Sequence, residues 1–323
     1  MLFIIWTLII LVLTLSQRRF TYMLGVNIAM LSGYFIYRIK FSYIILLILL
    51  IPNIVVTYHM SESPPKPSDE WYDSLVWMRE HLPEYGVMAW WDYGNWILYI
   101  SKKPVIANNF QIGGEEAARF FVATNESYAN EIMKKRKARY VITDRRMGLN
   151  LVQENKLVLK GAFSSIAGFA GHDISAYLDE RNLPNEKYFQ TMYAKLHVFD
   201  GNSLRNYRMI YESKKNYLNL FGRPTKDIKI FEYISGARII GNASREQRVS
   251  ISGRIITNQK RIFYYHQETK ADKNGYFEFI VPYSKDSPYE TKLVESYILK
   301  YDNTTHNINV LEKDINGSTI VVK

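Results

Sequence analysis

The amino-acid sequence predicts three successive parts: a multi-pass α-helical membrane segment, an extracytoplasmic α/β (mixed) domain, and a C-terminal all-β domain of sandwich-like or barrel-like form. Three observations lead to this prediction. Apolar runs fill most of residues 1–60, and helix-like and strand-like patterns alternate over residues 61–242. A period of two between apolar and polar side chains then dominates residues 243–323. These three ranges are the predicted domains.

The composition narrows the possible classes of function. The formal net charge of +10 suggests affinity for anions, such as a membrane surface or a pyrophosphate-linked lipid. The basic residues are scattered and no zinc finger or RNP box is present, so we expect no nucleic-acid partner. The sequence contains no cysteine, which excludes disulfides, zinc–thiolate sites and a cysteine nucleophile. The 25 tyrosines suit a surface that contacts carbohydrate or a membrane interface.

Three apolar stretches near the start of the sequence predict transmembrane helices. Residues 20–37 and 41–58 reach the roughly 17–20 residues that a membrane-spanning helix needs. Residues 2–15 fall short of that length, and they lack the basic start and the small-residue cleavage site of a signal peptide. We therefore interpret residues 1–60 as the last three transmembrane helices of a longer membrane domain.

The distribution of charge predicts the orientation of this segment. Arg38 and Lys40 lie between the second and third apolar stretches, and positively charged loops favour the cytoplasmic side of a membrane. Ser61 and the residues after it would then be extracytoplasmic. The predicted localisation is accordingly the cell membrane, with the globular part outside and a proline-rich linker at residues 61–67.

Residues 90–94, Trp-Trp-Asp-Tyr-Gly, form the most distinctive segment of the sequence. A helix with one apolar face over residues 68–82 and a short strand over residues 85–90 precede it, so it lies where a strand turns into the next helix. The indoles of Trp90 and Trp91 can donate hydrogen bonds and the carboxylate of Asp92 can accept one, which together would bind a small hydroxyl group. The alternative is that both tryptophans pack in a core while Asp92 caps the following helix.

A second group of side chains follows later in the sequence. Met192, Lys195 and Phe199 have the spacing i, i+3, i+7, which places them on one face of a helix. The alternative is an ordinary amphipathic helix with an exposed lysine. Asp144 follows a predicted strand, and we expect it to cap the turn there. The pairs 172–173 and 197–200 each join a histidine to an aspartate, but neither has a third metal ligand at a useful spacing.

The C-terminal part contains turn signals but no catalytic constellation. Asn274–Gly275 predicts a β-hairpin. We expect this part to be a structural or spacer module. Asn-x-Ser/Thr sequences, which arise often by chance, begin at Asn125, Asn242, Asn303 and Asn316.

The order of apolar stretches, Trp-Trp-Asp-Tyr-Gly and β-rich tail resembles the C-terminal part of the catalytic subunit of oligosaccharyltransferase. The similarity is greatest to the archaeal type, the dolichyl-phosphooligosaccharide–protein glycotransferases. Members of this family are membrane enzymes that transfer a lipid-linked oligosaccharide to asparagine in Asn-x-Ser/Thr sequons. The resemblance implies that this chain is part of a longer or split glycosyltransferase.

The resemblance also implies roles for individual residues. Trp90, Trp91 and Asp92 would bind the serine or threonine at position +2 of the sequon. Met192 and Lys195 would contact the same side chain, because they resemble a second family motif, Asp-x-x-Lys-x-x-x-Met/Ile or Met-x-x-Ile. This sequence departs from that motif at the first and last positions, which leaves the contacts open. Arg18 and Arg19 would contact the acceptor peptide near the membrane. The alternative is that these side chains only anchor the chain at the membrane interface.

The resemblance implies a metal and several partners. In the family, acidic residues of the N-terminal membrane half hold a divalent metal, Mn or Mg, that activates the leaving group. Residues 1–60 contain no aspartate or glutamate, so we expect neither catalytic residues nor metal ligands in this chain, and the chain alone would be inactive. It would be a fragment, a split subunit or a remnant. The implied partners are the acceptor polypeptide, the lipid-linked oligosaccharide, the membrane and the N-terminal transmembrane half. The alternative is a membrane-tethered peptide- or carbohydrate-binding module without catalysis.

Overall fold

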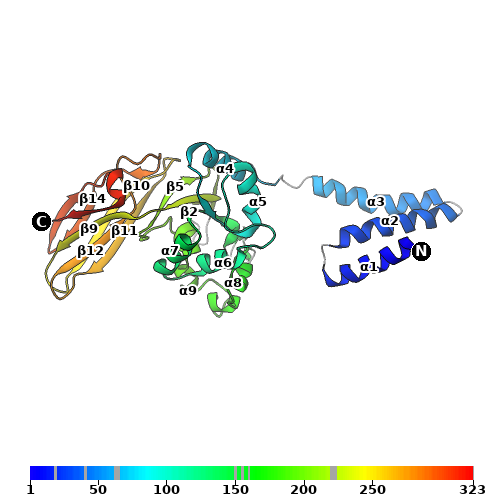
Figure 1. Ribbon diagram of the computed structural model, residues 1–323, viewed down its shortest axis with the longest axis horizontal. Coiled ribbons are helices and arrows are strands. Elements are labelled where there is room, and N and C mark those ends of the chain that lie inside the picture. The colour runs from blue at the N-terminus through cyan, green and yellow to red at the C-terminus, as the bar shows by residue number, and fades with distance from the viewer. Residues whose placement is uncertain are drawn as a thin grey trace. The chain divides into compact units, whose positions relative to one another are not determined.

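The computed structural model describes residues 1–17, 20–39, 42–61, 66–148, 151–153, 156–158, 161–218 and 224–322. The chain forms two compact units, Met1–Lys66 and Pro67–Lys323. Figure 1 shows the helical first unit in blue and the larger second unit in the remaining colours.

The described residues of the first unit form the helices α1 (Leu2–Ser16), α2 (Thr21–Arg38) and α3 (Ser42–Ser61). Asn27 of α2 is fully buried and donates a hydrogen bond of 3.2 Å from its Nδ2 to the Oγ1 of Thr7 in α1. A polar contact of this kind fixes how two apolar helices pair, because a buried amide is costly unless it is bonded. The pairing of α1 with α2 is therefore specific.

The predicted multi-pass membrane segment is wrong. Among the residues that the structure describes, no helix combines the length and the apolar character needed to cross a membrane. α1 has 15 residues; at the rise of an α-helix this gives about 22 Å, against a hydrocarbon core of about 30 Å. In α2, Asn27 interrupts the apolar sequence, and α3 contains Pro52 in its interior and His59 in its last turn.

A mixed β-sheet with the strand order β1-β2-β8-β5 forms the centre of the second unit. β1 (Gly86–Met88) runs parallel to β2 (Ala138–Asp144), whereas β8 (Ile228–Tyr233) is antiparallel to both β2 and β5 (Tyr207–Glu212). Six of the seven residues of β2 are buried, because this strand is central and covered on both faces. Residues 140–143, Tyr-Val-Ile-Thr, are aromatic or β-branched, which is typical of a strand.

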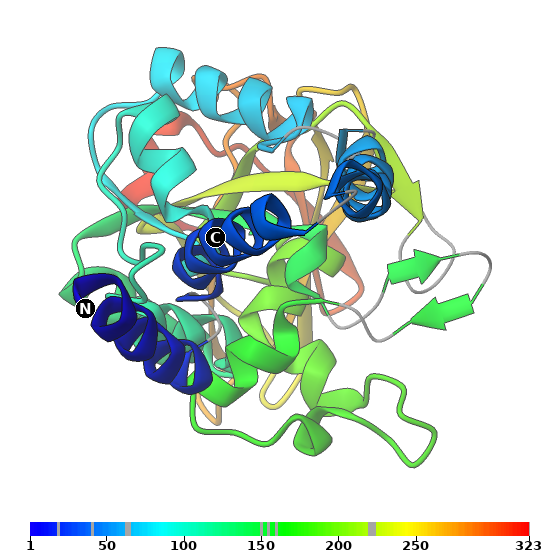
Figure 2. The same cartoon turned by 90° about the vertical axis from the view of Figure 1, so that its right-hand side faces the viewer.

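Helices cover both faces of this sheet (Figures 1 and 2). α4 (Asp69–His81) buries Trp71, Leu75 and Met78, the apolar face that the sequence predicted, and it carries two acidic residues in its first turn. α5 (Gly94–Trp96) lies on the same side as α4. The other side is covered by α6 (Gly114–Val122), α7 (Glu126–Lys135), α8 (Phe163–Phe169) and α9 (Glu186–Gln190).

Short elements connect these helices and strands. The helical turns are η2 (Trp91–Tyr93), η3 (Ile97–Ser101), η4 (Arg145–Met147), η5 (Ile174–Tyr177) and η6 (Ala194–Val198), of which η3 and η6 are π-helical. The small hairpins are β3 (Leu151–Gln153) with β4 (Lys156–Val158), and β6 (Asn216–Leu218) with β7 (Pro224–Lys226).

Two further sheets form the C-terminal part of the second unit, and we call them the peripheral sheets. One has the order β11-β10-β14-β15 with β13 beside β10, and the other has the order β12-β9-β16. Burial alternates along β10 and β11, as the period-two pattern predicted. The elements are β9 (Gly236–Asn242), β10 (Arg248–Ile256), β11 (Ile262–Lys270), β12 (Tyr276–Val281), β13 (Lys292–Leu293), β14 (Tyr297–Tyr301), β15 (Thr304–Ile308), η7 (Glu312–Ile315) and β16 (Asn316–Val321).

The turn at Asn274–Gly275 exists, but it does not make a hairpin. The carboxylate of Asp272 accepts hydrogen bonds of 2.8 Å from the backbone N–H groups of Asn274 and Tyr276, and Gly275 has a φ of +85°. The turn joins β11 to β12, which belong to different sheets, and β12 instead pairs with β9 along its whole length. Local turn chemistry fixed the reversal, whereas the partner strand was decided by pairing with a distant part of the sequence. The predicted division of the chain at residue 243 stays a prediction.

Candidate functional site

The Trp-Trp-Asp-Tyr-Gly segment lies at the carboxyl end of β1. Because β1 and β2 are parallel, this end is beside the carboxyl end of β2, where Asp144 lies. η2 begins immediately after Trp90, and α5 begins at Gly94. A Cβ atom on Gly94 would lie 2.3 Å from the backbone oxygen of Ala107, so only glycine allows the two backbone segments to approach this closely.

Two indole N–H groups in this segment are buried and have no partner among the described residues. Trp90 is fully buried and Trp91 is partly buried, and both rings pack near Phe169 of α8, with centroid distances of 5.4 and 6.3 Å. Among the described residues, neither Nε1 atom has a hydrogen-bond partner of ordinary geometry. Buried donors in folded proteins are nearly always paired, and an unpaired one costs about 1–3 kcal/mol. The site therefore holds two donors in need of an acceptor.

Asp92 supplies an acceptor in the same turn. Its carboxylate is partly exposed and makes no ion pair within the described part of the chain. Burial raises the pKa of Asp92, and the nearby Trp90 indole lowers that pKa in part without forming a well-directed bond. The side chain caps neither η2 nor α5, so the alternative in which Asp92 is a helix cap is not what the structure contains. Asn109 anchors the backbone here by donating to the Asp92 carbonyl oxygen at 3.1 Å.

Asp144 is a second carboxylate at this edge of the sheet. Its Oδ1 accepts a hydrogen bond of 2.5 Å from the backbone N–H of Arg146, which confirms the predicted capping role. Its Oδ2 also accepts from the Nε1–H of Trp71 at 2.6 Å, and the Trp71 ring packs on Tyr93 with a centroid distance of 4.4 Å. Burial and the neighbouring Asp227 raise the pKa of Asp144 to about 6.

Sequence reasoning missed this second contact of Asp144. No local pattern could reveal it, because Trp71 and Asp144 are 73 positions apart in the sequence. Trp71 of α4 is buried, and it connects Asp144 to residues 90–94, which we call the signature segment.

The second predicted group lies at the other end of α6. Met192 is fully buried, and its backbone N–H donates to the carbonyl oxygen of Ala123 at 2.7 Å. Lys195 is half-buried and donates from Nζ to the carbonyl oxygen of Thr124 at 2.7 Å. Desolvation lowers the pKa of Lys195, and Glu126 opposes this shift. Trp91, in contrast, lies against Gly114 at the first residue of α6.

The structure therefore does not bring the two groups into direct contact within the described residues. The nine residues of α6 separate them, which corresponds to about 13 Å at the rise of an α-helix. Arg18 and Arg19 lie outside the residues that the structure describes. His172 and His197 bond to the side chains of Tyr177 and Thr143, and the described part of the chain contains no cluster of three metal-ligating side chains.

A cavity of about 410 Å³ adjoins the second group through the segment Ala123–Thr124. Its lining combines basic and aromatic side chains with no carboxylate, from Arg119, Val122, Ala123, Thr124, Asn125, Tyr128, Ala170, His172, Tyr177 and Lys187. Met192 and Lys195 bond to the carbonyl oxygens of Ala123 and Thr124, two of the residues that line this cavity.

Two family models match this chain. The one described as AglB core domain matches residues 60–148, and the one described as archaeal glycosylation protein B long peripheral domain matches residues 236–321. Dolichyl-phosphooligosaccharide-protein glycotransferase 3 of Archaeoglobus fulgidus is 28% identical over 88% of this chain and 46% of its own length. The match thus spans less than half the length of this relative.

Solved structures of oligosaccharyltransferase from Archaeoglobus fulgidus have the same fold. One, in complex with an inhibitory peptide and a dolichol-phosphate, has a TM-score of 0.75 and 26% identity, covering 88% of this chain and 46% of that one. Another, tethered with an acceptor peptide containing the NVT sequon, has a TM-score of 0.73 and 25% identity, covering 88% and 47%. A complex with zinc and sulfate has a TM-score of 0.79, covering 99% and 56%, but at 24% identity it shows the fold alone. The chain belongs to the archaeal oligosaccharyltransferase family.

Proposed function

We propose that this chain is the C-terminal part of an oligosaccharyltransferase, which transfers a lipid-linked oligosaccharide to asparagine in Asn-x-Ser/Thr sequons. In this proposal Trp90, Trp91 and Asp92 read the serine or threonine at position +2. One observation carries it: among the described residues, two buried indole N–H groups without a well-directed acceptor lie in the same turn as the carboxylate of Asp92, which makes no ion pair there. A hydroxyl group is both an acceptor and a donor, and it would satisfy all three.

The energetics favour a hydroxyl over an apolar side chain. An alanine at position +2 leaves the two N–H groups and the carboxylate unpaired in a site that now excludes water. Each unpaired group costs about 1–3 kcal/mol, so losing the hydroxyl weakens binding by roughly 10-fold to 100-fold for each bond lost. A site built to bond a hydroxyl therefore discriminates strongly against its absence.

Lys195 has a different place in the proposal. It lies at the far end of α6, and a peptide rising about 3.3 Å per residue covers that distance in roughly four residues. We place Lys195 against the residues that flank the sequon, and Met192 beneath them as the buried support of the same turn. Peptide contact by Arg18 or Arg19 stays a prediction.

Metal, donor and location follow from the same proposal. A divalent metal would activate the leaving group of the lipid-linked donor, on ligands outside this chain. The relatives in complex with dolichol-phosphate and with peptide support a lipid donor and a polypeptide acceptor as partners. Because a lipid donor is presented at a membrane surface, we place the complete enzyme there, with this globular part on the extracytoplasmic side.

The test is a titration of the whole chain with two peptides, one Asn-x-Thr and the other its Asn-x-Ala twin. Wild type should prefer the threonine peptide, and Asp92→Ala should abolish the preference because the hydroxyl proton loses its acceptor. Asp73→Ala is the matched control, since Asp73 is an exposed acid on α4 whose ion pair with Lys214 is also exposed.

Three outcomes separate the possibilities. A preference that vanishes with Asp92 and survives the loss of Asp73 supports the proposal. Equal binding of both peptides by wild type contradicts it and favours a peptide-binding module without sequon selectivity. Unfolding of Asp92→Ala would instead assign the side chain a structural role, so circular dichroism accompanies each titration.

A further inference from the structure

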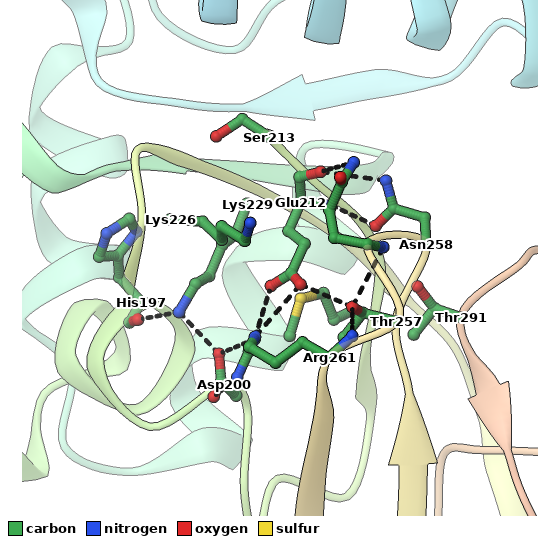
Figure 3. A network of polar contacts seen from close by, with 12 residues as sticks. His197, Asp200, Glu212, Ser213, Lys226, Lys229, Thr257, Asn258, Arg261 and Thr291 are labelled. Atoms are coloured by element: carbon green, nitrogen blue, oxygen red, sulfur yellow. Dashed lines mark hydrogen bonds and ion pairs between the residues drawn. The ribbon is translucent and has the colours of Figure 1, made fainter. Parts of the chain in front are cut away.

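A cluster of buried and partly buried charges joins the peripheral sheets to the α/β part of the second unit (Figure 3). It contains two carboxylates, Asp200 and Glu212, and two cations, Lys229 and Arg261. Arg261, immediately before β11, is the member contributed by the peripheral sheets. Buried ion pairs often contribute little net stability, so this cluster calls for another explanation.

Arg261 forms a bidentate ion pair with Asp200 through its guanidinium group. Nη1 donates to Oδ2 at 2.7 Å and Nη2 donates to Oδ1 at 2.8 Å. Lys229 of β8 approaches the same carboxylate at 2.6 Å, and its Nζ also donates to the carbonyl oxygen of His197 at 2.5 Å. Burial would raise the pKa of Asp200, but Lys229 and Arg261 together lower it to about 2.

Asp200 begins the turn that closes η6. Both Asp200 and Gly201 have positive φ angles, of 60° and 73°, and the N–H of Gly201 donates to the carbonyl oxygen of Lys195 at 2.8 Å. A non-glycine residue persists in this conformation only where its surroundings hold it there. η6 is itself π-helical, a rare form that is frequent at functional sites.

β11 holds the rest of the same turn. The backbone N–H of His266 donates to Oδ1 of Asn202 at 2.8 Å, and the hydroxyl of Ser203 donates to the carbonyl oxygen of His266 at 2.7 Å. The hydroxyl of Tyr265 donates to the carbonyl oxygen of Leu204 at 2.8 Å. Every one of these contacts comes from a peripheral strand and ends on the segment that follows Lys195.

We propose that Arg261 is a positioning residue: through Asp200 it fixes the turn that closes η6, and thereby holds Lys195 in the acceptor site. The inference rests on the proposed function for the role of Lys195, and on the contacts above for the rest. The peripheral sheets would then be part of the acceptor-binding apparatus, where the sequence predicted a spacer.

The experiment uses the whole chain with Arg261→Gln, Arg261→Lys and the control Arg254→Gln. Arg254 lies on β10 of the same sheets, and its ion pair with Glu295 is exposed, at 44% and 71%. Arg261→Gln should weaken binding of the Asn-x-Thr peptide about tenfold, which is a moderate loss of one site contact. Arg261→Lys keeps the charge but cannot form the bidentate ion pair, so its affinity for the peptide should lie between those of wild type and Arg261→Gln. Arg254→Gln should bind as wild type does.

A double-mutant cycle with Lys195→Ala separates positioning from general stability. If Arg261 acts through Lys195, Arg261→Gln should cause no further loss of affinity once Lys195 is absent. The proposal would be overturned if the losses of peptide affinity in Arg261→Gln and Lys195→Ala add in full in the double variant. It would also be overturned if Arg261→Gln binds the peptide as Arg254→Gln does. If Arg261→Gln does not fold, the same comparisons with Arg261→Lys decide.

Hydrogen exchange distinguishes failure of this proposal from failure of the proposed function. The amide of Gly201 should exchange about tenfold faster in Arg261→Gln than in Arg254→Gln, because its bond to Lys195 is loosened. Unchanged protection there overturns the positioning role whatever the peptides do. Faster exchange, combined with equal binding of both peptides by wild type, would overturn sequon reading and keep the role of Arg261 in fixing the turn.

Discussion

At the scale of single residues, two carboxylates at one edge of the central sheet have opposite environments. Asp92 is partly exposed and free of ion pairs among the described residues, whereas Asp144 is fully buried and accepts hydrogen bonds from Trp71 and Arg146. The pKa values of both are raised, in each case chiefly by burial. The free carboxylate is suited to bind a ligand, and the bonded one is suited to hold the frame on which the signature segment rests.

The raised pKa of Asp144 predicts a specific pH dependence of stability. Its folded value of about 6 exceeds the ordinary value of 3.8, so the folded state holds a proton between these pH values that the unfolded state has lost. The free energy of unfolding should therefore fall by roughly 3 kcal/mol as pH rises from about 4 to about 6, and stay lower above that. Asp144→Asn should remove this slope.

Denaturant titrations at intervals between pH 4 and pH 7 would measure this difference. Asp73→Asn is the control, because that exposed acid should leave the slope as it is in wild type. An Asp144→Asn variant with the wild-type slope would show that another group titrates in this range.

Some features of the candidate site could be predicted from the sequence, and others could not. Trp90, Trp91 and Asp92 are adjacent along the chain, so their grouping needed no knowledge of the fold. That both indole N–H groups lack partners depends on what packs around them, such as Phe169 of α8, which no local pattern reveals. Likewise, Met192 and Lys195 share a helical spacing, but that spacing does not say that α6 separates them from the first group.

At the scale of elements, the close approach at Gly94 leads to a second prediction. Its φ of −55° suits any residue, but a Cβ atom would lie 2.3 Å from the Ala107 oxygen and 2.6 Å from the Asn108 Cα, so the backbone must move. Gly94→Ala should lower the free energy of unfolding by about 1–3 kcal/mol, as other overpacked sites do. The substitution should also weaken peptide binding. The backbone that Gly94 approaches leads to Asn109, which donates a hydrogen bond to the carbonyl oxygen of Asp92, so a shift there would move Asp92.

Gly168 offers a matched control within α8. No atom lies within 4 Å of the position of its Cβ, so Gly168→Ala should be neutral or should raise stability by up to about 1 kcal/mol. Thermal unfolding of both variants would provide the comparison. Equal effects of the two substitutions would contradict the steric account of Gly94.

Elements with a strong periodic pattern were the most predictable. α4 was expected over residues 68–82 and spans Asp69–His81, because an apolar stripe and two acidic first-turn residues agree. The predicted membrane helices were wrong, because no helix among the described residues combines the length and the apolar character needed to cross a membrane. The Asn274–Gly275 turn was found but its strands pair elsewhere, because strand pairing is a long-range property.

At the scale of the whole molecule, buried charges connect sheets that the sequence suggested were separate. Besides the cluster at Arg261, Arg208 of β5 bonds both Glu232 of β8 and Glu312 of η7, each at 2.8 Å. Opening the peripheral sheets away from the central sheet would require all of these bonds to break together. The second unit should therefore behave as one cooperative structure.

This leads to a prediction for unfolding. Pulse-labelling hydrogen exchange during a denaturant titration should give the same midpoint for β2 in the central sheet and for β14 in the peripheral sheets. A two-state unit requires such coincidence because all its probes report one transition. Two separated midpoints would show that the peripheral sheets fold independently, and would weaken the case for their role in the acceptor site.

The unpaired indoles of Trp90 and Trp91 also have a spectroscopic consequence. An indole emits at longer wavelength when its N–H gains a hydrogen-bond acceptor, since the excited state has the larger dipole and is stabilised more. Trp71 already has such a partner in Asp144, so its emission should change little when a ligand binds. The two indoles whose surroundings would change most are Trp90 and Trp91, whose N–H groups have no acceptor within the described part of the chain. Native fluorescence can therefore report the arrival of a hydroxyl group in real time, without a label.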